Sequence, residues 1–158
     1  MLDTRLHSAG EISSLTCLEE LKARHNQVDF LAGIGSLPLS VLDISFNKLH
    51  SVAALASVVS LKELHVASNV LTSVRGIGSL WQLNVLDVSN NNLATLEELR
   101  AAQGLTLLRR VATQGNGFHK ARHARLHILH LLPFLINLDG VYVDAKEKVH
   151  AANLHGAA

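Results

Sequence analysis

Three residues that could exchange protons recur at equal spacing in the middle of the chain. Asp43, His65 and Asp87 follow one another at intervals of 22 residues. An imidazole that lies between two carboxylates could serve in general acid–base catalysis. The sequence, however, has no nucleophile with an orienting base, no glycine-rich phosphate loop and no pocket-forming insertion to accompany them. We therefore predict that the protein is not an enzyme and needs no cofactor.

A second group of residues could ligate a metal ion near the C-terminal end. His119, His123, His127 and His130 are spaced by four, four and three residues, which places them along one stripe of a predicted helix. Structural zinc sites usually combine ligands from two segments and often include cysteine. We therefore predict no metal site, and expect the stripe to pack against the last repeat or to face solvent.

The equal spacing of the acid–base residues comes from a repeated leucine-rich motif. Residues 39–49 follow the pattern L-x-x-L-x-L-x-x-N-x-L, and its asparagine recurs at positions 26, 47, 69, 91 and 116. Apolar residues at positions four and six of each copy predict a short strand, and stacked copies predict a parallel sheet on the concave face of an arc. We expect each asparagine to bond backbone groups at the bend after its strand, so that the copies form a ladder.

These repeats divide the chain into three parts. We predict a partial N-terminal repeat over 1–17, five repeats over 18–118 and a C-terminal cap over 119–158. Because the chain begins inside a repeat, we expect either further sequence upstream or a partner that covers this end. Residues 95–102 read as a longer helical insertion capped by Thr95. The cap should contain helices over 120–132 and 144–154, the second with Asp144 as its N-cap.

Composition restricts the class of protein further. Apolar residues make up 48% of the chain and aromatic residues 4%, which suits a layered aliphatic core and leaves few rings for stacking on nucleic acid. The single cysteine, Cys17, excludes an internal disulfide and favours a reducing compartment. No apolar run approaches membrane-spanning length, and the first residues lack a signal-peptide core. We expect an intracellular, cytoplasmic protein that binds no membrane.

The repeat and the tail together resemble a known family. The 22-residue rhythm, and the tail residues Arg125, Leu132-Pro133, Leu138-Asp139-Gly140 and Glu147, are similar to the short leucine-rich repeat class with a C-terminal leucine-rich-repeat cap. That class includes a phosphatase-regulatory subunit, the spliceosomal A-prime protein and an axonemal dynein light chain. The resemblance implies an α/β leucine-rich repeat solenoid with a parallel sheet on the concave face and a helical C-terminal cap. It also implies protein binding without catalysis.

Within this class, the ending over 147–156 is similar to the endings of ciliary members. We therefore favour a ciliary or axonemal, microtubule-associated scaffold located in the cilium. One alternative is a nuclear, spliceosomal A-prime-like subunit that binds an RNA-recognition domain. A second alternative is a phosphatase regulatory subunit.

The register of the repeats gives the candidate binding residues. The span from 99 to 138 contains no Asp or Glu, so its basic residues could form a patch for an acidic partner such as tubulin, with nucleic acid bound at most indirectly. Trp81 lies outside the regular apolar rows and could anchor a partner at one edge. The predicted concave residues are Val41, Asp43, Phe46, Glu63, His65, Val85, Asp87 and Arg110, and the predicted acidic-partner patch is Arg109, Lys120 and Arg122.

Overall fold

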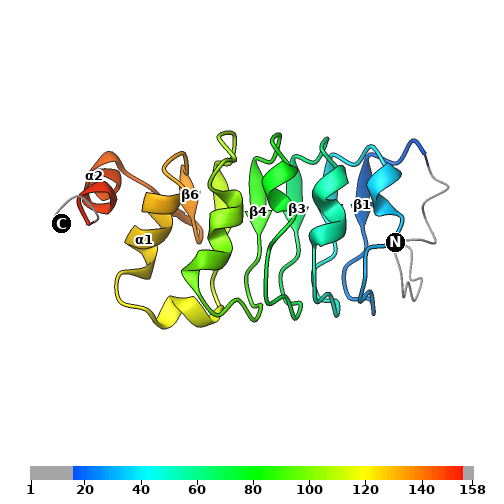
Figure 1. Ribbon diagram of the computed structural model, residues 1–158, viewed down its shortest axis with the longest axis horizontal. Helices are drawn as coiled ribbons and strands as arrows, with labels where there is room; N and C mark the ends of the chain where they lie inside the picture. The colour runs from blue at the N-terminus through cyan, green and yellow to red at the C-terminus, as the bar shows by residue number, and fades with distance from the viewer. Residues whose placement is uncertain (1–15, 155–158) are drawn as a thin grey trace.

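The strands stack in the order in which they occur along the chain. The computed structural model describes residues 16–154, and in these residues seven strands form one sheet. The first six strands run parallel, and the last pairs antiparallel with the sixth (Figure 1). The strands are β1 (Glu20–Lys22), β2 (Val41–Asp43), β3 (Glu63–His65), β4 (Val85–Asp87), β5 (Arg110–Ala112), β6 (Asn137–Leu138) and β7 (Val141–Tyr142). The predicted solenoid with a concave parallel sheet is confirmed.

The pairing register follows the motif without a slip. Leu21, Leu42, Leu64, Leu86 and Val111 pair in sequence across the first five strands, so position four of each copy forms one column. From Leu42 onward this column is buried, whereas the residues on either side of it stay partly exposed on β2, β3 and β4. This is the period of two that sends alternate side chains to opposite faces of a strand.

Short 3₁₀ helices return the chain between strands. Those between β1 and β5 form the layer in front of the sheet in Figure 1, and the apolar residues of the 3₁₀ helices complete a continuous core. Thr95 does not cap the longest of them, because its side chain makes no cap hydrogen bond and its backbone oxygen instead accepts from the Glu98 amide at 3.3 Å. The five are η2 (Ile34–Ser36), η3 (Ala53–Ser57), η4 (Ile77–Ser79), η5 (Leu96–Ala102) and η6 (Gly117–Lys120).

The asparagine ladder is present as predicted. The Asn69 amide donates to the backbone oxygens of Val66 and Ala67 in its own repeat and of Ile44 in the preceding one, at 3.0, 3.3 and 3.1 Å. Its Oδ1 accepts from the Leu49 amide at 2.9 Å. Each buried asparagine therefore joins two repeats. The same role is taken by Asn47, Asn91 and Asn116.

The first helix of the cap is shorter than the sequence predicts. Helix α1 spans Ala124–Leu131 and not residues 120–132. Lys120 ends η6, Ala121 is extended, and His123 has a φ of 59° in the left-handed region, so the helix starts only after it. The second helix, α2 (Ala145–Asn153), has the predicted cap, because Asp144 Oδ1 accepts from the Glu147 amide at 2.8 Å.

An arginine–glutamate pair joins the two cap helices to the sheet. Arg125 of α1 donates from Nε and Nη2 to the two carboxylate oxygens of Glu147 on α2, and from Nη1 to the Leu138 backbone oxygen at 2.9 Å. These hydrogen bonds from Arg125 hold the pKa of the Glu147 carboxyl below its usual range. They also raise the pKa of Arg125, so both groups stay charged at neutral pH.

The depressed pKa predicts an acid-sensitive cap. Glu147→Gln should lower the free energy of unfolding by about 1.5–3 kcal/mol at pH 7, the range for hydrogen bonds to charged groups. The pKa of Glu147 in the folded protein lies below its unfolded value of about 4.3. The difference in unfolding free energy between wild type and variant should therefore be complete above that pH and disappear as the pH falls through the folded pKa. Urea unfolding from pH 7 to 2 measures it. In an Arg125→Met background the same substitution should change stability little, and an equal loss there would contradict the pairing.

Candidate protein-binding site

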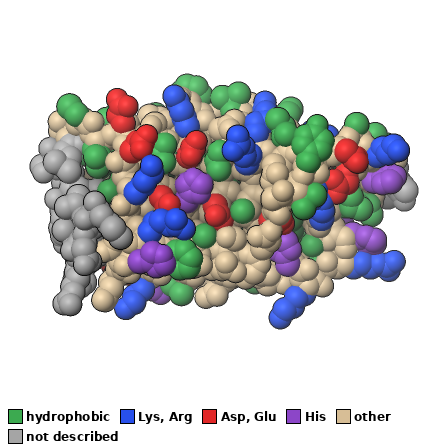
Figure 2. Space-filling model, turned by 180° about the vertical axis from the view of Figure 1, so that it is seen from behind, with side chains coloured by type: hydrophobic (Ala, Val, Ile, Leu, Met, Phe, Trp, Pro, Cys, Tyr) green, Lys and Arg blue, Asp and Glu red, His purple; other side chains and the backbone are tan. Residues whose placement is uncertain are grey.

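The predicted concave residues form two adjoining rows across the sheet. Val41, Glu63, Val85 and Arg110 occupy one row, because they pair in sequence from β2 to β5. The second row contains Asp43, His65 and Asp87, which pair in the same way. Figure 2 shows charged side chains of both signs gathered across the middle of this surface, which we call the sheet face.

The two aspartates of the sheet face are held by their own turns. Asp43 Oδ1 accepts from the Ser45 amide at 3.1 Å, and Asp87 Oδ1 accepts from both the amide and the hydroxyl of Ser89, at 3.0 and 2.6 Å. Within residues 16–154 the carboxylate at ion-pair distance from the His65 imidazole is that of Glu63, at 3.7 Å. Each aspartate therefore uses its Oδ1 to hold the turn at the end of its strand.

Phe46 lies just beyond the C-terminal end of β2 in an unusual backbone conformation. Its φ is 58°, in the left-handed region that bulky residues rarely adopt. The same position in other repeats is also left-handed, so the bend after the strand requires it. The ring is exposed, stacks on the His25 imidazole at 4.3 Å between centroids, and lies 5.5 Å from the Arg24 guanidinium carbon. Arg24 also pairs with Asp43 at 3.4 Å.

A shallow hollow of about 130 Å³ lies at the C-terminal end of the sheet face. Both apolar and charged residues line it, so it could accept one side chain of a partner. The lining residues include His65, Val85, Asp87, Arg110, Ala112 and Asn137.

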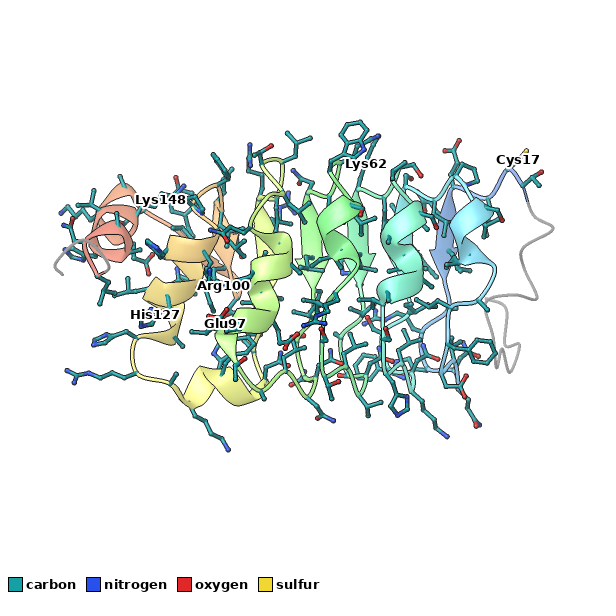
Figure 3. All side chains as sticks on the ribbon, viewed as in Figure 1. Cys17, Lys62, Glu97, Arg100, His127 and Lys148 are labelled. Carbon is teal, nitrogen blue, oxygen red and sulfur yellow. The ribbon has the colours of Figure 1, made fainter. Side chains whose placement is uncertain are left out.

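The four histidines do not form the predicted stripe. His119 lies in η6, where its Nε2 is 2.8 Å from Thr113 Oγ1 and 3.6 Å from Asp139 Oδ2, so it packs against the last repeat. His123 precedes α1, and only His127 and His130 belong to that helix. The latter two border a hollow of about 160 Å³ beside Arg100 of η5 (Figure 3). Within residues 16–154 no group of three His, Cys, Asp or Glu side chains is arranged to hold a metal ion.

The predicted acidic-partner residues lie at two separate places. Arg109 precedes β5, whereas Lys120 and Arg122 follow it in η6 and the loop beyond, so the strand separates them. Lys120 and Arg122 are both exposed. The three basic residues therefore do not make one contiguous patch.

The predicted edge anchor, Trp81, has 58% of its surface exposed, as an edge anchor requires.

Several residues of these surfaces were not singled out from the sequence. Arg24 and His25 belong with Phe46, but their ring contacts depend on the left-handed bend and not on a motif. Asn137 enters the hollow because β6 extends the sheet beyond the fifth repeat.

Comparisons with known proteins agree with this geometry. Residues 59–101 match the family model described as leucine-rich repeats in two copies. A chain of the crystal structure of the Drosophila melanogaster SNF/U2A′ complex is similar, with a TM-score of 0.80, 20% identity and coverage of 91% of this chain and 89% of that one. An internalin (inlF) from Listeria monocytogenes has a TM-score of 0.71 and 26% identity over 85% of this chain and 38% of its own. Comparison with curated protein sequences found no match.

In the described part of the chain, no helix is long and apolar enough to cross a bilayer.

Proposed function

Because this chain is a short leucine-rich repeat protein, we propose that it is a non-catalytic adaptor that binds another protein on its sheet face. The observation that carries the proposal is the two-row surface of β2 to β5, where valines alternate with charged residues in one fixed register. Such a surface offers apolar contact together with charges that select a partner. We assign the binding residues to the sheet face, with Phe46 as the anchor just beyond the end of β2.

For the partner, we favour an acidic protein surface such as tubulin in a ciliary or axonemal setting. Two observations support this choice. The span from 99 to 138 has no acidic residue, and Arg110 projects from the sheet face within it. The C-terminal ending is also similar to endings of ciliary members of the class. The cytoplasm of the cilium is therefore the proposed location.

The alternative is a nuclear role that resembles the spliceosomal A-prime protein. It is favoured by the likeness to a chain of the SNF/U2A′ complex, which extends over nine-tenths of both chains. At 20% identity this likeness concerns the fold, so the partner must be tested directly. In this alternative the sheet face would hold an RNA-recognition domain.

Binding measurements on variants of the sheet face separate these possibilities. Phe46→Glu keeps a Cβ atom in the left-handed position, so it removes the ring without changing the backbone cost. Arg110→Glu reverses the charge at the hollow. Each variant should lower the affinity for microtubules, measured by co-sedimentation, at least about tenfold. A tenfold change corresponds to a loss of roughly 1.4 kcal/mol of binding free energy. Wild-type binding should also be lost at about 0.5 M salt, where charges are screened within a few ångströms.

The matched control is Lys146→Glu, an exposed charge reversal on α2 away from the sheet face, which should bind as wild type does. Titration of a purified RNA-recognition domain serves as the second arm. Binding of that domain, weakened by Phe46→Glu, would establish the alternative. If the sheet-face variants bind every partner as tightly as wild type, the sheet face is not the binding site.

A further inference from the structure

The turns that lead into four consecutive strands carry exposed apolar side chains. Each turn is closed by one backbone hydrogen bond, as in the bond from the Leu83 amide to the Leu80 oxygen at 2.8 Å. The two residues enclosed by that bond point away from the core. One of them is large and apolar in every case, with 45%, 58%, 46% and 47% of its surface exposed for Val59, Trp81, Leu107 and Phe134 respectively.

This composition is the opposite of what turns favour. Central turn positions usually hold Gly, Pro, Asn, Asp or Ser, which suit the backbone and the solvent. Single exposed hydrophobic residues are ordinary on protein surfaces, but a row of them indicates an interaction site. The row recurs in repeat after repeat, although the leucine motif does not require it. Folding alone therefore does not account for these side chains.

Backbone bonds place these turns side by side along one edge of the sheet. The residue that follows each turn bonds to its counterpart in the preceding repeat: the Asn84 amide to Lys62, Arg109 to Asn84 and Ile136 to Arg109, at 2.8, 2.9 and 2.8 Å. Lys62 marks this upper edge in Figure 3, and Figure 2 shows hydrophobic side chains along the same border. Ile136 is 47% exposed and extends the row. We call this row the apolar rim: Val59, Trp81, Leu107, Phe134 and Ile136.

Basic residues follow two of the turns of the apolar rim, Lys62 and Arg109, and the strands after them begin with Glu63 and Arg110, which have opposite charge. The Arg109 guanidinium is fixed at the turn that carries Leu107, because its Nη1 donates to the Thr106 and Leu108 oxygens at 2.7 and 3.1 Å. Within residues 16–154, no carboxylate forms an ion pair with any of these three basic residues. A partner that complements this edge must be apolar and acidic.

The spacing of the repeats selects the shape of the partner. Neighbouring strands lie about 4.8 Å apart, so successive turns advance along the edge by a similar distance. An α-helix rises about 5.4 Å per turn, so a helix laid along the edge presents one side chain to each repeat. An extended strand rises about 3.3 Å per residue, so its side chains recur on one face about every 6.6 Å. That spacing does not match the distance between neighbouring repeats.

We propose that the apolar rim is a docking site for an amphipathic α-helix of another protein, with one apolar side chain per turn and acidic residues on its flanks. The helix lies across the repeats, with its apolar stripe on Trp81, Leu107 and Phe134 and its carboxylates toward Lys62 and Arg109. The site is separate from the sheet face and does not depend on the function proposed for that face. The protein can then hold two partners at once.

Trp81 is the single tryptophan of the chain, so its fluorescence reports directly on the site. The probe is a synthetic 15-residue helical peptide with leucine once per turn and glutamate on both flanks. Its addition should shift Trp81 emission to shorter wavelength as the indole leaves water. The same peptide with lysine in place of glutamate should bind at least tenfold more weakly. Raising the salt concentration should weaken the binding of the acidic peptide.

Two variants decide where the peptide binds. The double substitution Leu107→Ser and Phe134→Ser keeps the reporter and should weaken binding at least tenfold. The matched control is Phe30→Ser, which removes an aromatic ring that is 52% exposed in the first repeat and should change nothing. Phe46→Glu should also bind the peptide as wild type does, which separates this result from the test of the sheet face. Circular dichroism confirms that each variant is folded.

Three outcomes would overturn the proposal. The first is an unchanged emission spectrum up to millimolar peptide. The second is equal affinity for the wild type and the double variant, or for the acidic and basic peptides. The third is a dimer in sedimentation velocity that the double variant abolishes, because the occupant would then be a second copy of this chain.

Discussion

Replacing Asn69 with alanine should lower the free energy of unfolding by about 3–5 kcal/mol, a large part of the stability of a domain of this size. The amide is buried and makes four hydrogen bonds, three as donor and one as acceptor. Alanine leaves the Leu49 amide without its acceptor. The Ile44, Val66 and Ala67 oxygens each lose one donor and keep another, from Asn47, Asn91 and Phe46 respectively. A buried amide without an acceptor costs about 1–3 kcal/mol, and each lost hydrogen bond to an oxygen that keeps another donor costs about 0.5–1.5 kcal/mol.

The position of Asn69 in the middle of the array adds a second effect. A repeat protein is stabilised by interfaces between neighbours, and loss of a central interface uncouples the two halves. Urea unfolding monitored by circular dichroism should therefore show a lower midpoint together with a broader transition. Asn92→Ala is the matched control, because Asn92 lies one repeat later, its side chain is exposed, and it contributes only its backbone amide, which donates to the Leu71 oxygen at 2.9 Å. Equal stability of the two variants would contradict the structural role of the ladder.

The second large effect is expected at Gly76, which precedes η4. Its φ is 103°, which L side chains rarely adopt, and an added Cβ would lie 2.8 Å from the Ala53 Cα of the preceding repeat. The obstacle is backbone, so it cannot rotate aside. Gly76→Ala should therefore lower the free energy of unfolding by about 3 kcal/mol, the combined range for backbone strain and for overpacking.

The matched substitution for this prediction is Gly104→Ala. A Cβ at Gly104 meets nothing within 4 Å, and its backbone is not in the left-handed region. The substitution should leave stability unchanged or raise it by about 0.4–1 kcal/mol, because alanine restricts the unfolded chain. Thermal unfolding of the two variants provides the comparison. A Gly76→Ala protein as stable as Gly104→Ala would show that the two return segments are not packed this closely.

Much of the fold could be predicted because its determinants are local and repeated. Alternation at positions four and six sets the strand, and the asparagine directly after the left-handed residue forms the ladder. These signals occur in every copy, so the register follows from the spacing of 21 to 25 residues. The start of α1 was harder to predict. The apolar pattern extends back to Lys120, but His123 turns left-handed and interrupts it.

The candidate site was predicted in its rows but not in its details. Pairing of Asp43, His65 and Asp87 follows from the register, whereas the serine bonds that occupy the aspartates depend on the turn that follows each strand. The apolar rim was missed apart from Trp81. Its other members lie at turn centres, where the leucine motif gives no expectation and an isolated hydrophobic residue carries no signal.

The reversed strand β7 bears on how this protein behaves at high concentration. A parallel sheet with an open end invites another chain to add a strand, which leads to fibres. Here the chain turns back after Leu138, pairs Val141 and Tyr142 with β6 over only two residues, and then enters α2. A very short edge followed by a helix is a poor template for a newcomer. The C-terminal end therefore resists end-to-end polymerisation, and the solenoid keeps a defined length on that side.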